Sequence, residues 1–314
     1  MTSQEKHGFT LYHVLFSGLK DKFGSSNFLL TYNGKKAPDL EKLVAARYSG
    51  EFTGKLFMDS GAFPAFKKNT DLPIDPYIAY VNEVGQHFDG IAQLDYISRE
   101  SDGTTAQRQE KSIRLTWERF LYMWERVKPE FRHKLIYIMH EAEHIEPLLE
   151  RVLTWRDSRG QGVGYLGCGL ASPNRLNRER HTETIERMCK KHGYTGKFHA
   201  FGVQQLDIIQ QSNFITSSDS SSAVRDQMTG SISIEGKQVK IQDDTKEHHR
   251  SELTFYQRQA IEQHLKERAD EMGIDYELAK TSAAERYLWG CRERDRYFQE
   301  NYRKKVPKKK KGLL

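Results

Sequence analysis

Two aspartates lie in short segments that are typical of turns, and together they could act on a glycosidic bond. Asp59 lies in the segment MDSGAF, and Asp219 lies in the serine-rich segment TSSDSSS. When two carboxylates face one pocket, one can stay ionised as a nucleophile while the other holds a proton for the departing group. Such a pair can break a bond at the anomeric carbon of a sugar with retention, through a covalent glycosyl-enzyme intermediate. Taken alone, MDSGAF also fits an ordinary turn, and the serine run also fits a flexible linker.

Other polar or small residues share one property, which is that each stands at the end of a predicted strand. Asp95, His140, Gly167 and Gly169 all end or follow a short apolar run. Alone, His140 fits a helix cap or a buried hydrogen-bonded imidazole, and the two glycines fit a tight turn. Together these residues favour a site in which the glycines leave room for a flat ring and expose backbone N–H groups to its carbonyl oxygen.

The elements that must position these residues alternate regularly along the chain. Short apolar, β-branched or aromatic runs are separated by longer charged segments with helical spacing, which predicts parallel βα units. The eight runs are Tyr12–Phe16, Phe28–Tyr32, Lys55–Met58, Gly90–Leu94, Leu135–Met139, Gly164–Cys168, Phe198–Val203 and Asn213–Thr216. This order predicts an α/β fold, a closed (β/α)8 TIM barrel, whose active site lies at the C-terminal ends of the strands.

The character of the chain changes after the eighth run. We expect residues 1–228 to form the (β/α)8 catalytic core, residues 229–302 a hairpin and helical extension packed on the barrel, and residues 303–314 a basic disordered tail. Alternation in SISIEGKQVKI predicts the hairpin, and Glu252–Met272 and Tyr276–Tyr302 are predicted to be two long helices. Aromatic residues at helical spacing in the second helix indicate a face packed on the barrel more than a surface that stacks bases.

The positive charge is concentrated at the C-terminus. The net charge is +6, and Arg303, Lys304, Lys305, Lys308, Lys309, Lys310 and Lys311 supply seven positive charges with no acid among them. Without these seven, residues 1–302 carry a net charge of −1. Such a tail fits a mobile arm that binds phosphates and, equally well, a solubilising end.

Cysteine usage and hydropathy indicate the compartment. The three cysteines, Cys168, Cys189 and Cys291, are far apart and lack CxxC spacing, which indicates reduced thiols rather than a zinc or redox site. No apolar run approaches the roughly 18 residues that a bilayer span requires. We therefore expect a soluble cytoplasmic protein with no membrane partner.

Several motifs, taken in order, resemble those of one enzyme family. The segment Asp59–Phe63 resembles the DSGGFQ motif of the queuine tRNA-guanine transglycosylases, with Ala62 for the second glycine and Pro64 for the glutamine. Gly167–Ala171 is similar to the family's GGLAVG loop, and His199–Val203 resembles its LMGVG strand. The match covers roughly residues 50–230 and is specific as a set.

The resemblance implies a role for each candidate residue. Asp219 matches the nucleophilic aspartate, and Arg225 and Gly230 follow it in a region similar to the family's PTRxGRNG segment. Asp59 would be the general acid and base, and Asp95 falls where the family has an aspartate that binds the purine's Watson–Crick edge. The other expected base-binding residues are Ser60, His140, Gly167, Gly169 and Leu170, and Arg225 and Lys308 to Lys311 are expected to hold phosphates.

Departures from the family pattern affect the expected metal and substrate. The family's structural zinc motif, CxCxxC with a distant histidine, has no counterpart here, so we expect no metal and no cofactor. The compact length and the TSSDSSS segment resemble the phage-type 7-deazaguanine DNA transglycosylases. That subfamily implies exchange of guanine in DNA for a base such as 7-cyano- or 7-aminomethyl-7-deazaguanine, in the host cytoplasm if a phage encodes the protein. A transglycosylase acting on tRNA, a hydrolytic base glycosylase and a non-catalytic nucleic-acid-binding barrel are the alternatives.

Overall fold

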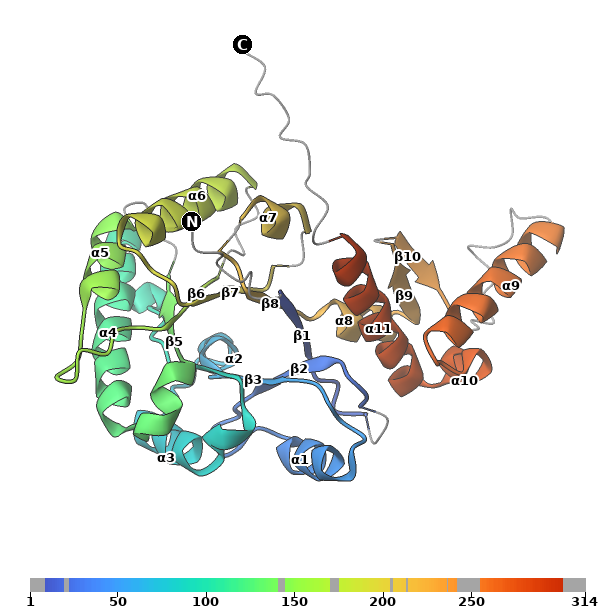
Figure 1. Cartoon of the computed structure of the whole chain (residues 1–314), viewed down its shortest axis with the longest axis horizontal. Helices are drawn as coiled ribbons and strands as arrows, with labels where there is room; N and C mark the ends of the chain where they lie inside the picture. Colours follow the sequence, from blue (N-terminus) through green and yellow to red (C-terminus); the bar gives the residue numbers. More distant parts are fainter. Residues whose placement is uncertain are drawn as a thin grey trace, which may run out of the picture.

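The computed structural model describes residues 9–19, 23–140, 145–169, 175–203, 206–212, 214–235, 237–241 and 255–301. Eight parallel strands close into a barrel in chain order, from β1 to β8, with helices around the outside (Figure 1). The predicted (β/α)8 TIM barrel is therefore confirmed. The strands are β1 (Thr10–Val14), β2 (Asn27–Thr31), β3 (Leu56–Asp59), β4 (Gly90–Ala92), β5 (Leu135–Met139), β6 (Tyr165–Gly169), β7 (Lys197–Phe201) and β8 (Ser217–Ser220).

Helices follow most of the strands. They are α1 (Leu40–Ser49), α2 (Ala62–Lys67), α3 (Ile74–Val84), α4 (Thr105–Arg126), α5 (Glu146–Thr154), α6 (Arg175–Lys191), α7 (Leu206–Gln211) and α8 (Ser222–Met228). The longest of them, α4, begins at a capping box in which the Thr104 hydroxyl accepts from the Gln107 N–H and the Gln107 side chain accepts from the Thr104 N–H. None of the described helices is long and apolar enough to cross a membrane.

Side chains alternate between the inside of the barrel and the helix layer. Those that fill the interior are Tyr12, Leu29, Phe57, Ala92, Ile136 and Tyr165, with Val14, Ile138 and Phe201 packed against them. Because neighbouring residues in a strand point to opposite faces, residues two positions further along also point inward. Asp59 follows Phe57 by two residues in β3, so this alternation brings its carboxyl group into the upper end of the barrel.

The eighth strand differs from its prediction. We expected it at Asn213–Thr216, with the serine-rich segment as a loop behind it, but β8 is Ser217–Ser220 and lies within that segment. Thr10 and His199 pair with Ser217 from the two neighbouring strands, so the backbone of β8 is hydrogen-bonded on both sides. The short side chain of Ser217 fits here because the rings of Tyr165 and His199 fill the adjacent interior. The strand contains no apolar run, so hydrophobic spacing does not predict it.

The chain after the barrel forms a compact extension beside β1. It contains the hairpin β9 (Ser231–Ile234) and β10 (Lys237–Lys240), then α9 (Phe255–Glu271), α10 (Tyr276–Thr281) and α11 (Ala283–Asn301). The predicted single helix Tyr276–Tyr302 is wrong, because it is divided at Ser282, whose hydroxyl accepts from the Glu285 N–H at 3.3 Å and so caps α11. Tyr287, Trp289 and Phe298 are buried, so the aromatic face of α11 is a packed face.

Helix α11 covers β1 on the outside of the barrel, next to α8 (Figure 1). His13 Nε2 lies 2.8 Å from Asp295 Oδ1, and the Ser26 hydroxyl donates to Asp295 Oδ2 at 2.7 Å. The Tyr287 hydroxyl donates to the Val14 carbonyl oxygen at 2.9 Å. The described part of the connection from β1 to β2 contains no helix, so α11 supplies the outer cover of the first strand.

Candidate active site

Asp59 ends β3 and is held by the tight turn that follows it. Its Oδ2 accepts a hydrogen bond from the Gly61 N–H at 3.3 Å. Gly61 has a φ of 76°, and a Cβ added there would meet the Tyr32 carbonyl oxygen at 2.1 Å. Only glycine satisfies both conditions, so the DSG sequence forms a turn that the neighbouring strand would not allow with a larger residue.

The surroundings of Asp59 favour its protonated form. Burial is the largest cause, and the nearby Asp219 and Asp95 carboxylates add to it, so that the pKa of Asp59 is raised to about 7. Hydrogen bonds from Gly61 and Thr31 act in the opposite direction. Near neutral pH, Asp59 can therefore both give and take a proton, as a general acid and base must.

Asp219 points into the barrel from β8 and is held by two donors. Its Oδ1 accepts from the Gly202 N–H at 2.8 Å and lies 3.2 Å from His199 Nε2. Its side chain is 14% exposed, so the carboxylate is confined but still reachable from the mouth of the barrel. The two contacts hold the carboxylate in one orientation. A carboxylate held in this way can act as a nucleophile, because its oxygen keeps a fixed direction toward the atom that it attacks.

A hydrogen-bond chain runs from Asp219 into the barrel core. His199 is fully buried, its Nδ1 lies 2.9 Å from Ser217 Oγ, and Ser217 Oγ lies 2.8 Å from the Tyr165 hydroxyl. Burial lowers the pKa of His199, although Asp219 opposes this, so the imidazole is neutral near pH 7. One arrangement of protons satisfies every group, with Tyr165 donating to Ser217, Ser217 to His199, and His199 Nε2–H to Asp219.

His199, Ser217 and Tyr165 were not predicted as site residues. From the sequence, His199 is predicted only as part of a strand motif and Ser217 only as part of a loop. A signal was available, because a polar residue two positions before a strand-end aspartate faces the same side of the strand. A histidine at an inward position of a barrel strand is buried and needs a hydrogen-bonding partner.

Asp95 lies beside Asp59 and has its own set of partners. It follows β4, its Oδ2 lies 3.4 Å from His140 Nε2, and the Ser60 side chain hydrogen-bonds to it. Arg119 Nη1 donates to the Asp95 carbonyl oxygen at 3.0 Å. Burial raises the pKa of Asp95, while His140 and Arg119 oppose that rise. The structure thus brings together Ser60, Asp95 and His140, which the sequence predicts at one site.

The predicted glycines line the interior of β6, and the remaining predicted residues are placed differently. A Cβ at Gly167 would come within 2.6 Å of the Phe201 ring, whereas a Cβ at Gly169 would meet nothing within 4 Å. Gly169 therefore borders open space at the strand end. Arg225 is exposed on α8, and its Nη2 donates to Ser222 Oγ at 3.1 Å. Leu170 and Lys308 to Lys311 lie outside the described residues.

The three aspartates at the C-terminal ends of β3, β4 and β8 combine a proton carrier, a hydrogen-bond acceptor and an anchored carboxylate. This set can hold a planar heterocycle and act on the bond that joins it to a sugar. In the part of the chain that the structure describes, no group of three or more His, Cys, Asp and Glu side chains is arranged to hold a metal ion. Neither a protein-family model nor a curated protein matches this sequence.

Proposed function

We propose that the protein is a transglycosylase that exchanges guanine in DNA for a 7-deazaguanine base. The observation that carries the proposal is the contrast between two carboxylates at one barrel mouth. Asp59 has a pKa of about 7, whereas Asp219 is held by His199 and the Gly202 N–H. Two carboxyl groups with such different surroundings suit a proton carrier and a nucleophile. The resemblance of the motifs around them to the guanine transglycosylases supports the choice of substrate.

The base would bind between Asp95 and the open end of β6. The Asp95 carboxylate can accept hydrogen bonds from the ring N–H and the exocyclic amine of guanine. Ser60 and His140 contact this carboxylate and hold it in place. Gly169 leaves space for the flat ring. The target nucleotide must leave the helical stack first, at a cost of a few kcal/mol, because its C1′ is inaccessible inside a duplex.

The first half of the reaction releases guanine. An Asp219 oxygen attacks C1′, the new C1′–O bond forms, and the bond from C1′ to N9 of guanine breaks. The electron pair of the broken bond stays on the base, which takes the proton from Asp59. The products are a glycosyl ester of Asp219, free guanine and an ionised Asp59.

The second half inserts the new base. The incoming 7-deazaguanine gives its N9 proton to the Asp59 carboxylate, and N9 attacks C1′. The ester bond breaks, so Asp219 is again a carboxylate and Asp59 is again protonated. One glycosidic bond replaces another, and no external energy source is needed. Exclusion of water from the closed site favours exchange over hydrolysis.

The test is to incubate the purified protein with 7-aminomethyl-7-deazaguanine and either DNA or tRNA, then to identify the nucleosides by mass spectrometry. We expect the modified deoxynucleoside from DNA. Modification of tRNA alone would refute DNA as the substrate, and base loss that leaves abasic sites would identify a hydrolytic glycosylase.

The nucleophile is tested separately by trapping the covalent intermediate. A DNA–protein adduct that survives denaturation should form with the wild type and should be absent from Asp219→Asn. The control variant is Asp270→Asn, because Asp270 is exposed on α9 and outside the site, yet it loses the same charge. An adduct in Asp219→Asn at the wild-type level would exclude Asp219 as the nucleophile.

A further inference from the structure

A second pocket lies at the opposite end of the barrel from the three aspartates. Its volume is about 410 Å³. Several of its lining residues come just before or at the start of strands, with Lys55 before β3, Asp89 before β4, Lys134 before β5 and Lys197 in β7, and Arg47 joins them from α1. Asp59 and Asp219, in contrast, lie at the C-terminal ends of their strands. The pocket is therefore separate from the proposed catalytic site. Its volume is large enough to hold a small ligand.

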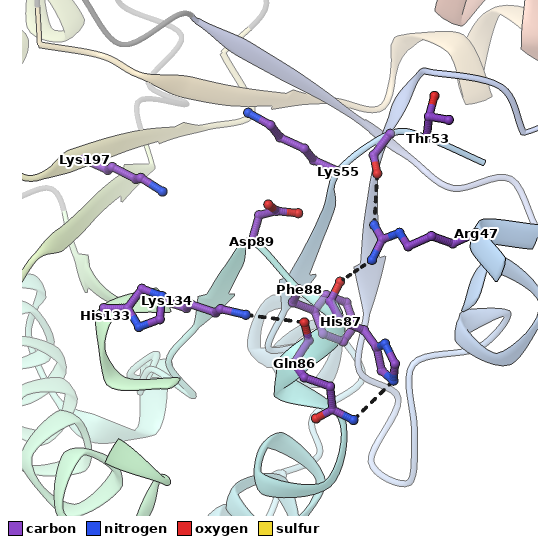
Figure 2. Close-up of a pocket in the computed structure, with 11 residues that line it drawn as sticks. Arg47, Thr53, Lys55, Gln86, His87, Phe88, Asp89, His133, Lys134 and Lys197 are labelled. Atoms are coloured by element: carbon purple, nitrogen blue, oxygen red, sulfur yellow. Dashed lines mark hydrogen bonds between the residues drawn. The ribbon is translucent and has the colours of Figure 1, made fainter. Parts of the chain in front are cut away.

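The pocket carries an excess of positive charge. Figure 2 shows Lys55, Lys134, Lys197 and Arg47 around the single lining carboxylate, Asp89. Four cations against one anion give a local charge of +3 when the lining histidines are neutral. Of the residues that the structure describes, no carboxylate forms an ion pair with any of these four cations.

The polar contacts of these side chains are mostly with neutral groups. Arg47 donates to the carbonyl oxygens of His87 and Gly54 at 3.1 and 2.9 Å, and Lys134 donates to those of Gly85 and Gln86 at 3.1 and 3.4 Å. These bonds fix Arg47 and Lys134 in place but bring no negative charge to them, so Asp89 is the carboxylate that lines the pocket with them.

The two remaining lysines are exposed. Lys55 Nζ lies 3.4 Å from the Thr10 hydroxyl, and Lys197 Nζ lies 5.6 Å from the centre of the Tyr165 ring. Asp89 Oδ2 is already an acceptor for the Leu56 N–H at 3.1 Å. The ammonium groups of Lys55 and Lys197 can therefore donate hydrogen bonds to a ligand. Figure 2 shows Lys55, before β3, above Asp89 and Lys197, in β7, to the left of it.

The crowding of cations also affects the neighbouring imidazoles. Burial lowers the pKa of His87, and Arg47 and Lys134 lower it further. The pKa of His133 is lowered by burial and then by Lys134 and Lys197. A bound anion would offset this repulsion, so both histidines should become easier to protonate when the pocket is filled.

We propose that this pocket binds a phosphate group. A multivalent anion suits a site with three lysines and an arginine better than a single carboxylate does, since lysine acts as a point charge toward phosphate oxygens. The phosphate could come from a small molecule, as inorganic phosphate or a nucleotide, or from the backbone of a nucleic acid. Both sources present the same oxygens, and they differ in what is attached.

The experiment measures binding to the full-length protein with two probes, inorganic phosphate and a single-stranded oligonucleotide, at constant ionic strength. The pocket variant is Lys55→Gln with Lys197→Gln, in which both substituted side chains are exposed. The control is Lys190→Gln with Lys237→Gln, which removes two exposed positive charges from α6 and β10. Thermal unfolding of both variants verifies that the fold is retained.

We expect the pocket variant to bind phosphate about tenfold more weakly than the control, as loss of charge-assisted hydrogen bonds predicts. Phosphate should also raise the pKa of His87 and His133, measured by NMR, in the control but not in the pocket variant. If phosphate alone does not bind, a loss of oligonucleotide affinity in the pocket variant alone would identify the nucleic-acid backbone as the source. Equal affinities of the two variants for both probes would overturn the proposal.

The outcome is independent of the proposed base exchange. Binding is measured without the deazaguanine substrate, and Asp219→Asn should keep the phosphate site while it loses the covalent adduct. Failure of one proposal therefore leaves the other to be decided by its own measurement.

Discussion

Asp59 and Asp219 are the same type of residue, but they differ in what surrounds each carboxyl group. Asp59 is buried and lies near the Asp219 and Asp95 carboxylates, and together these raise its pKa to about 7. Asp219 accepts from a backbone amide and lies beside a neutral histidine. At the scale of single residues, the proposed division of labour thus depends on neighbours from other strands of the barrel, and the two short motifs alone do not contain it.

The first prediction concerns the pH dependence of guanine release. The pKa of Asp59 is raised, so the acid form is present below about pH 7 and is lost above it. The single-turnover rate of guanine release should therefore fall as pH rises from 6 to 9. Quenched-flow measurement of free guanine gives this profile. In Asp59→Asn the rate should be low and nearly independent of pH, and a wild-type rate that climbs through pH 7 would contradict a general acid at this position.

The second prediction assigns His199 a positioning role. In His199→Phe the ring still stacks on Phe57, whose centroid lies 4.3 Å away, but the hydrogen bond to Asp219 is lost. A hydrogen bond to a charged group contributes about 1.5–3 kcal/mol, so kcat should fall about tenfold to a hundredfold while KM for the base changes little. The matched variant Tyr165→Phe removes only the far end of the hydrogen-bond chain and should have a smaller effect.

Partial recovery distinguishes positioning from packing. His199→Gln retains an N–H donor in reach of Asp219, so part of kcat should return. Equal activity of His199→Phe and the wild type, or a change in KM alone, would show that the hydrogen bond to Asp219 does not assist the reaction.

At the scale of elements, the strands were predictable where apolar side chains define them. β5 has the predicted bounds, and β1 to β4, β6 and β7 overlap their predicted runs. The eighth strand was misplaced because it has no apolar run, and the role of Ser217 as a small polar partner for Tyr165 and His199 arises only in the closed barrel. The division of the C-terminal helix at Ser282 was likewise missed, since helical spacing continues across it while the serine caps a new helix.

The candidate site was predictable to a similar extent. Asp59, Ser60, Asp95 and His140 could be grouped from the sequence because parallel strands bring their C-terminal ends to one rim. The hydrogen-bond chain behind Asp219 could not be grouped in this way. It depends on the register that places Ser217 opposite His199, and no sequence motif records that pairing.

The third prediction concerns the contact between β1 and α11. Burial would lower the pKa of His13, but Cys291 and Asp295 outweigh it and raise the pKa to about 10. A raised pKa in the folded state contributes stability that is complete below about pH 6.5, the ordinary value, and is lost as pH rises toward 10. The free energy of unfolding in urea should therefore decrease across this range.

Asp295→Asn tests this contact. The variant removes the partner of a buried imidazolium, so it should lose roughly 3 kcal/mol at pH 6, and its stability should depend less on pH between 6.5 and 10. Asp270→Asn serves as the control with the same change of charge. If Asp295→Asn showed the wild-type slope with pH, a group other than His13 would be responsible.

At the scale of the whole molecule, charge is separated along the barrel axis. Carboxylates gather at the C-terminal ends of the strands and cations at the N-terminal ends. A polyanion approaching the mouth would meet acidic groups in the site, so DNA binding as proposed requires cations elsewhere. The seven positive charges of residues 303–311 are candidates in the sequence.

The fourth prediction follows from that separation. Deletion of residues 303–314 should weaken DNA binding and should flatten its dependence on salt, because each phosphate neutralised contributes about 0.9 to the slope of log K against log salt concentration. Fluorescence anisotropy at several salt concentrations measures both quantities. Exchange at saturating DNA should be retained, and an unchanged slope would show that these lysines do not contact phosphates.

The pairing of His13 with Asp295 joins residues that are 282 positions apart in the chain. During synthesis, His13 on the outer face of β1 is made 282 residues before Asp295 of α11. At about 5–20 residues per second, that delay lasts tens of seconds. Until then α8 is already available to contact β1, but β1 lacks the contact with α11, so a ribosome-bound chain can hold most of the barrel without this part of its cover. The order of translation thus makes the packing of α11 on β1 a late step in the assembly of the barrel.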